Sequence, residues 1–312
     1  MDIASKMARG PANQVSDVMK RISIPEADAI IGKRFKVLDK GFVALVDYMG
    51  SDAAIVQAAR VSYGMGTKSV NDDAGLINYL MRHRHTGPFE MVEVKFLASM
   101  PMYVAREWVR HRTASINEYS ARYSIVPDKF NIPDLQEIGA QATKNRQGRE
   151  GNVDDEVASA FRRDVEEVSD SAYERYQKAI DGGVAREQAR ILLPVNAYTE
   201  WYWKIDLNNL FHFLSLRLDD HAQEEIRAYA KVMADITKTI VPAAYAAFEN
   251  YVLNSVTFSE KEMAALKDIF AGSSTEDACE AAGLRLFRED GQRMKSGEGV
   301  EFLEKARALL RK

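Results

Sequence analysis

The spacing of hydrophobic residues predicts three strands. Residues 91–98 alternate between apolar and charged side chains, which is the period of a half-buried strand. Residues 35–37 form a short apolar run that ends in a turn at Asp39-Lys40-Gly41, and residues 198–205 (YTEWYWKI) are rich in the aromatic residues that strands favour. These segments predict the strands of one sheet.

Longer segments repeat their apolar residues every three or four positions, as helices with one buried face do. Ser99 with Pro101 begins one of these helices, Gly182-Gly183 ends another, and Pro242 bends or divides the last. The predicted helices cover residues 15–24, 52–59, 73–81, 101–110, 156–180, 185–194, 207–217 and 224–251, and their N-terminal caps include Ser51 or Asp52, Asp72 or Asp73, and Asp206.

Together these elements predict an α/β (α+β) fold, with a mixed sheet flanked by helices and a largely helical second half. Residues 35–256 form the central domain, between an N-terminal extension at 1–34 and a helical C-terminal extension at 257–312. Within the domain, residues 134–155 are rich in Gly, Gln, Asn and charge. A mobile loop or insertion is expected there.

Composition narrows the possible functions. The formal net charge of −4 at pH 7 argues against a general nucleic-acid binder. A single cysteine, Cys279, excludes a disulfide framework and a multi-cysteine metal site. No run approaches the roughly 20 apolar residues of a membrane span, and the N-terminus has no apolar signal region. We expect a soluble protein of the cytoplasm that does not contact membranes.

The segment 110–122, RHRTASINEYSAR, concentrates the candidate chemistry. Its arginines repel one another unless an anion lies among them, and their planar forks suit phosphate oxygens. The serines, the asparagine and the glutamate can hydrogen-bond a sugar or the edge of a base. From composition alone, a phosphate site and a solvated charged segment are about equally favoured.

The pattern of this segment resembles the signature of the flavin-dependent thymidylate synthases. Seven positions carry the resemblance: Arg110, His111, Arg112, Ser115, Asn117, Ser120 and Arg122. Residues 85–90 (HTGPFE) resemble the second motif of that family, and residues 212–223 (HFLSLRLDDHAQ) resemble its C-terminal motif. The resemblance covers roughly residues 35–251 and implies that 35–256 is the catalytic domain.

The resemblance implies a methyltransferase that converts deoxyuridine monophosphate (dUMP) to dTMP. It implies FAD as cofactor, NADPH as reductant and methylenetetrahydrofolate as carbon donor, in a homotetramer with FAD at the subunit interfaces. The only cysteine lies in the C-terminal extension, so a cysteine nucleophile is not expected and an organic cofactor must carry the chemistry.

Residue by residue, the resemblance also assigns the site. The dUMP contacts it implies are Glu107, Arg110, Glu118, Tyr119, Ser120, Ala121, Arg122, Arg190 and Arg217. Arg217 is the implied catalytic residue, because a fixed positive charge at the uracil carbonyl edge would stabilise the deprotonated ring. The implied FAD contacts are Ser62, His85, Gly87, Arg110, His111, Arg112, Glu118, Asp206, Leu207, Asn208 and His212. No metal site is expected.

Three other functions account less well for the same residues. A nucleic-acid-binding module lacks a groove-reading motif. A hydrolytic metalloenzyme lacks histidines at ligand spacing beside a carboxylate, except His83-Arg84-His85, which the flavin motif already uses. An inactive homologue with a structural or regulatory role is the main alternative. Glu107, Gly87, Asp206 and His212 depart from the usual residues of the family, and a carboxylate at 107 or 206 cannot donate a hydrogen bond.

Overall fold

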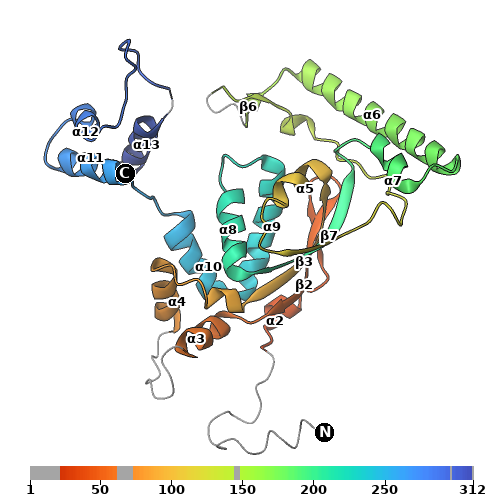
Figure 1. Cartoon of the computed structure of the whole chain (residues 1–312), viewed down its shortest axis with the longest axis horizontal. Coiled ribbons are helices and arrows are strands. Elements are labelled where there is room, and N and C mark those ends of the chain that lie inside the picture. The colour runs from red at the N-terminus through yellow and green to blue at the C-terminus, as the bar shows by residue number, and fades with distance from the viewer. Residues whose placement is uncertain (1–21, 62–72, 144–147, 296, 311–312) are drawn as a thin grey trace, which may run out of the picture. The chain divides into compact units, whose positions relative to one another are not determined.

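The structure is a computed structural model that describes residues 22–61, 73–143, 148–295 and 297–310 (Figure 1). The chain divides into two compact units. Unit 1 contains the residues up to 133 and residues 163–248, and unit 2 contains residues 134–162 and 249–312. The predicted helix at 15–24 lies mainly outside the described residues, and the described residues 22–24 are not helical.

Unit 1 is built on a five-stranded sheet with the order β1-β2-β3-β7-β4. The strands are β1 (Arg34–Val37), β2 (Gly41–Met49), β3 (Glu93–Pro101), β7 (Tyr198–Asp206) and β4 (Ser115–Glu118). The predicted α+β class is confirmed. The sheet was expected to be mixed, but all four pairs of its strands are antiparallel, and the tight turn between β1 and β2 allows only an antiparallel pair there.

One face of this sheet carries the core. Phe96 of β3 and Trp201 and Trp203 of β7 are fully buried. The ring of Trp108, at the end of α5 (Met102–Trp108), lies edge-on to Trp201 at 5.4 Å and to Trp203 at 5.3 Å. The helices α8 (Leu207–Arg217) and α9 (Glu224–Ile240) also contact the sheet. This packing fixes the ends of α5, β7 and α8 relative to one another.

The predicted end of β3 was wrong by a few residues. Ser99 does not cap a helix but lies inside the strand, where its hydroxyl accepts from Lys129 Nζ at 3.0 Å. Pro101 ends β3 and is the N-cap of α5. The strand extends this far because β3 pairs with β7 along its whole length, from Glu93 opposite Asp206 to Pro101 opposite Tyr198.

Ser51 and Asp52, the two predicted helix caps, cap two different helices. The Ser51 hydroxyl accepts from the amide of Ala53 and caps α3 (Asp52–Val61). The Asp52 carboxylate accepts from the amides of Ala243 and Ala244, at the start of α10 (Pro242–Phe248). Pro242 divides the predicted long helix into α9 and α10. A π-helical turn (Glu249–Leu253) follows α10. The other elements of unit 1 are α2 (Pro25–Asp28), α4 (Asp73–Arg82), η2 (Phe89–Met91), α7 (Arg186–Ala189) and η4 (Arg190–Leu192).

Helix α6 (Asp155–Asp181) forms where the sequence predicts it. Its predicted buried face is partly exposed, however, since Val157 and Val168 are each 57% exposed and Phe161 is 50% exposed. The buried positions of this helix include Ala158 and Tyr176.

Residues 134–155, where a mobile loop or insertion is expected, contain short elements of secondary structure in their described part. The described residues form a 3-10 turn (η3, Leu135–Glu137) and a two-stranded sheet, β5 (Gly139–Gln141) with β6 (Arg149–Asn152). Gly139 permits the pairing, because a Cβ there would lie 2.8 Å from the carbonyl oxygen of Gly151. The C-terminal part contains α11 (Glu260–Phe270), α12 (Thr275–Ala281) and α13 (Glu298–Leu310), in line with the predicted helical extension.

The C-terminal helices have their own core, in which Cys279 and Phe302 are fully buried. Burial raises the pKa of the Cys279 thiol. Among the described residues, no helix is long and apolar enough to cross a bilayer.

Candidate functional site

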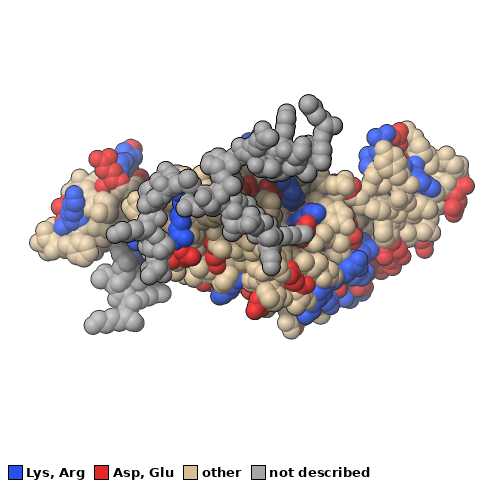
Figure 2. All heavy atoms as spheres, turned by 90° about the horizontal axis from the view of Figure 1, so that it is seen from below, with Lys and Arg blue, Asp and Glu red and all other residues tan. Residues whose placement is uncertain are grey.

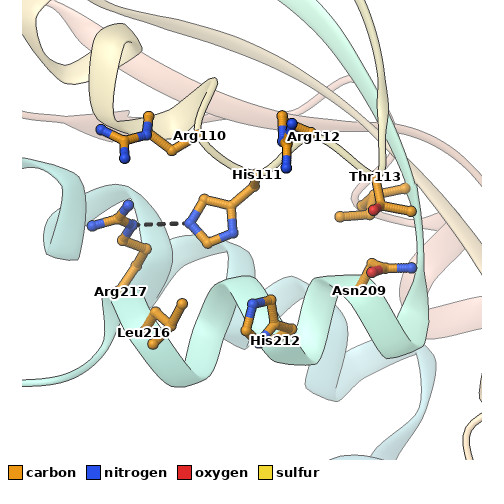
Figure 3. A pocket seen from close by; sticks show the side chains of 9 residues that line it. Arg110, His111, Arg112, Thr113, Asn209, His212, Leu216 and Arg217 are labelled. Atoms are coloured by element: carbon orange, nitrogen blue, oxygen red, sulfur yellow. Dashed lines mark hydrogen bonds between the residues drawn. The ribbon is translucent and has the colours of Figure 1, made fainter.

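A cavity of about 280 Å³ lies between the loop after α5 and one face of α8 (Figure 3). The loop contributes the segment Arg110–Thr113, and α8 contributes Asn209, His212, Leu216 and Arg217. Ile205, near the end of β7, completes the lining. Among the described residues that line the cavity, three are arginines and none is acidic.

Local structure explains why these side chains meet. Helix α8 begins where the Asp206 carboxylate accepts from the amide of Asn209 at 2.9 Å, a standard N-cap. Asn209, His212 and Leu216 follow one another at spacings of three and four, so they share one face of the helix. The buried ring of Trp108 anchors the end of α5, and the loop that follows presents its polar side chains to this face.

Arg217 connects three elements of the site. Its Nε donates to Nε2 of His111 at 3.1 Å, and its Nη2 donates to the backbone oxygen of Glu107 at 3.2 Å. Its Nη1 lies 3.7 Å from Oε2 of Glu107. The side chain is only 20% exposed, so the guanidinium is oriented before any ligand arrives.

The electrostatics of this group keep His111 neutral. Burial, with the positive charge of Arg217 and the neighbouring His212, lowers the pKa of His111 to about 4. The ring packs edge-on against Phe213 at 4.8 Å. Burial also raises the pKa of Glu107, although Arg217 opposes that rise and Glu225 adds to it.

The second group of predicted residues lies at the other end of β4. Arg122 forms an ion pair with Glu187 (Nε to Oε2, 3.2 Å), in which both side chains are more than half exposed. Arg190 donates to the backbone oxygen of the same Glu187 at 3.3 Å. The Ser120 hydroxyl accepts from the amide of Arg122. None of these side chains lines the described cavity.

A small core holds this second group in place. Ala121 and Val126 pack with Tyr176 of α6 and Ala189 of α7, which fixes the loop that carries Arg122 against the helix that carries Glu187. Ala121 is 9% exposed, so a ligand can reach little of this residue. Glu118 accepts from the hydroxyl of Thr199 at 2.6 Å, and the Tyr119 hydroxyl donates to the backbone oxygen of Ile125 at 2.7 Å.

The remaining predicted flavin residues are dispersed around unit 1. His85 and Gly87 are exposed just after α4, and the ring of His85 stacks on Tyr79 at 5.9 Å. The carboxylate of Asp206 is occupied as the helix cap, and the side chain of Leu207 is fully buried. Asn208 is half-buried and does not line the cavity. Ser62 lies outside the described residues.

Sequence reasoning overlooked several residues that matter here. Thr113, Asn209 and Leu216 line the cavity, and Glu187 and Thr199 hold Arg122 and Glu118. Helical spacing from His212 would have found Asn209 and Leu216. Glu187 and Thr199 leave no local signal, because their partners are 65 and 81 residues away.

A family model, related sequences and a solved structure all match proteins that are thymidylate synthases or UMP/dUMP methylases. A family model described as thymidylate synthase complementing protein matches residues 44–243. A flavin-dependent thymidylate synthase of Ehrlichia ruminantium (strain Gardel) is 54% identical over 274 residues, which cover 88% of this chain and 92% of the relative. One from Treponema denticola is 50% identical over 273 residues, with 86% and 99% covered. The structure is also similar to that of the UMP/dUMP methylase PolB from Streptomyces cacaoi bound with 5-Br UMP, with 35% identity, a TM-score of 0.64, and 71% and 99% of the two chains covered.

Proposed function

The chain belongs to the flavin-dependent thymidylate synthase family and is a methyltransferase, and we propose that it converts dUMP to dTMP with FAD as its flavin. In this proposal NADPH is the reductant and methylenetetrahydrofolate is the carbon donor. A substrate of this kind is supported by the PolB structures, one bound with 5-Br UMP and another with 5-Br dUMP. A cytoplasmic location remains part of the proposal.

The observation that carries the proposal is the cavity on α8. It gathers the guanidinium groups of Arg110, Arg112 and Arg217 around a neutral imidazole, which suits an anionic ligand that also carries a polar ring. A cysteine nucleophile has no support, since the one cysteine of the chain is fully buried among apolar side chains.

The cavity residues fit part of an FAD molecule. Arginine forks suit its diphosphate, and Ile205 and Leu216 offer apolar surface to a flat ring. The volume of about 280 Å³ is below the roughly 300–1,000 Å³ typical of sites that enclose a whole drug-sized ligand. One copy of the chain therefore supplies a partial FAD site. When bound, the flavin would supply the redox and one-carbon chemistry that no side chain here can perform.

Within this site, Arg217 is the residue we assign to ring activation. Glu107 holds its guanidinium through the backbone and the carboxylate, so the positive charge is preorganised. A fixed cation at the uracil carbonyl edge stabilises negative charge that develops on the ring, and this stabilisation is stronger in a half-buried site than in water. The Glu107 carboxylate then serves to orient Arg217.

We assign the exposed group, which consists of Arg122 and Arg190, to the phosphate of dUMP. Arg122 pairs with the Glu187 carboxylate, and Arg190 donates to the backbone oxygen of Glu187, so a carboxylate already occupies the position beside Arg122 that a phosphate would take. The Ser120 hydroxyl lies in the same turn. An incoming phosphate dianion would compete with one carboxylate charge for these groups.

We also propose that the nucleotide site is completed by a second copy of the chain in a homotetramer, with FAD at the interfaces. Arg112 precedes β4 and Arg122 follows it, and this four-residue strand spans roughly 13 Å at about 3.3 Å per residue. The two arginine groups therefore lie at opposite ends of one strand. Bringing them onto one nucleotide is easier between copies than within one.

Mixing two impaired variants tests this arrangement, at a dUMP concentration too low to saturate Arg122→Ala. Arg217→Met damages the cavity group, and Arg122→Ala damages the exposed group. If the two groups of one site come from different copies, mixed tetramers contain some intact sites, and the mixture is more active than the average of its two components. A mixture that shows only this average, after subunit exchange is verified, would contradict the shared site.

The function itself is tested by incubating the purified protein with dUMP, methylenetetrahydrofolate, NADPH and FAD, and measuring dTMP. Formation of dTMP that needs all four additions is expected. A protein that binds FAD and dUMP but makes no dTMP would support the alternative of an inactive homologue.

A further inference from the structure

His111 has two ring nitrogens, and the protein engages one of them. Arg217 Nε donates to Nε2 of His111 at 3.1 Å. An arginine side chain has only hydrogen-bond donors, so Nε2 must offer its lone pair. The neutral imidazole then carries its single proton on Nδ1.

Nδ1 faces the cavity. In Figure 3 this nitrogen points away from Arg217, toward the space between Arg112 and His212. Both of those residues line the cavity, as His111 does. The protonated nitrogen is therefore available to a ligand.

The groups around His111 disfavour a second proton. Arg217 and His212 face it from α8, Arg110 and Arg112 flank it on its own loop, and Glu107 is the carboxylate nearby on α5. The charge of Glu225, on α9, raises the pKa of Glu107. The Glu107 carboxylate pairs with Arg217, while burial and the charges of Arg217 and His212 lower the pKa of His111 to about 4.

Two contacts with Glu107 fix the orientation of the Arg217 guanidinium. The backbone oxygen of Glu107 accepts from Nη2 at 3.2 Å, and the carboxylate lies 3.7 Å from Nη1. These contacts leave Nε directed at the imidazole. The chain from Glu107 through Arg217 to His111 is thus a fixed sequence of hydrogen bonds.

We propose that Arg217 is a positioning residue that fixes His111 as the neutral Nδ1–H tautomer, so that the cavity presents an uncharged hydrogen-bond donor to an acceptor atom of the flavin ring. This inference rests on the proposed flavin site. The other neutral tautomer would face the ring nitrogens and carbonyl oxygens of a flavin with a lone pair, and an imidazolium would add a positive charge to a cavity that already holds three.

Solid-state nitrogen NMR of protein labelled at its histidines tests the proposal, since protonated and unprotonated ring nitrogens resonate far apart. The chain has five histidines, and comparison with His111→Gln identifies the signals of His111. At pH 7, without FAD, we expect a protonated Nδ1 and an unprotonated Nε2. Adding FAD should shift the Nδ1 signal.

Variants at position 217 separate positioning from charge. Arg217→Lys can still donate to Nε2, so the Nδ1–H tautomer should persist. Arg217→Met cannot donate, so both tautomers should appear and the pKa of His111 should rise from about 4 toward its ordinary value of ~6.5. Arg112→Met removes a positive charge from the same cavity without touching Nε2, and the tautomer should stay unchanged.

Three results would overturn the assignment. They are a wild-type His111 with its proton on Nε2, a wild-type His111 protonated on both nitrogens at pH 7, and an Arg217→Met spectrum identical to wild type. If the tautomer is as proposed but FAD leaves the Nδ1 signal unchanged, the flavin is not the acceptor. A protein that takes up no FAD at all would instead refute the proposed function, while the tautomer result would still stand or fall by the FAD-free spectra.

Discussion

The chain carries two groups of arginines, and they differ in how firmly the protein holds them. In the cavity group (Arg110, Arg112 and Arg217), Arg217 is 20% exposed and is tied to Glu107 and His111. In the surface group (Arg122 and Arg190), Arg122 and its partner Glu187 are 58% and 53% exposed. A half-buried charge acts through a lower effective dielectric, whereas an exposed one is screened by solvent and salt. The cavity group is thus suited to stabilise charge during a reaction, and the surface group is suited to anchor a phosphate.

The largest effect is expected in the cavity group. Arg217→Lys keeps the charge but loses the planar fork, so turnover should fall by roughly 100-fold or more, as it does when a preorganised donor is lost, while FAD content stays unchanged. Flavin absorbance and initial rates measure the two quantities. Arg106→Lys, exposed on the helix that carries Glu107, is the matched control and should turn over normally. Wild-type turnover in Arg217→Lys would refute the proposed ring activation.

In the surface group the effect should fall on nucleotide affinity. Arg122→Ala removes one charge-assisted contact worth about 1.5–3 kcal/mol, so the Kd for dUMP should rise by roughly 10- to 100-fold while FAD content is unchanged. Deoxyuridine, which has no phosphate, serves as the control ligand. Equal weakening of dUMP and deoxyuridine would show that Arg122 does not read the phosphate.

The lowered pKa of His111 predicts how the stability of the fold depends on acid pH. Because the pKa of His111 is about 4 in the folded chain and ~6.5 when unfolded, the unfolded state binds more protons between these values. The contribution of His111 therefore destabilises the fold progressively as the pH falls from ~6.5 toward 4. Between pH 7 and pH 5, the Tm of His111→Gln should fall less than the Tm of the wild type. Parallel losses in the two proteins would mean that His111 is not held neutral by the fold.

The smallest effect is expected at Glu187. An exposed ion pair is worth about 0.2–1 kcal/mol, so Glu187→Gln should free Arg122 and tighten dUMP binding by a few-fold at most. The gain should vanish in the Arg122→Ala background and shrink at high salt. Weaker binding in Glu187→Gln would instead indicate that Glu187 contacts the nucleotide directly.

The sequence predicted much of what lies close together in the chain. The period of residues 91–98 and the cap at Asp206 predicted β3 and α8, and the signature placed Arg110, His111 and Arg112 in one loop. The structure brings that loop to His212 and Arg217. The resemblance had put all of them in one site, but no local pattern shows that Arg217 bonds to His111.

Contacts between distant residues were beyond the sequence. The pairing of Arg122 with Glu187 depends on how α7 packs on the loop after β4, through Ala121 and Ala189. The β5–β6 pair was missed because its strands are short, polar and rich in glycine, so they lack the alternation that marks a strand. The exposed positions of α6 were predicted as buried because an apolar stripe does not reveal whether this chain or another surface covers it.

The most direct test of the central claim is an anaerobic absorption spectrum of the FAD-loaded protein, recorded while NADPH is added with and without dUMP. If the cavity holds the flavin beside the nucleotide site, the flavin bands should bleach with NADPH, and faster when dUMP is present. A protein that shows no flavin bands and takes up no added FAD would contradict the account.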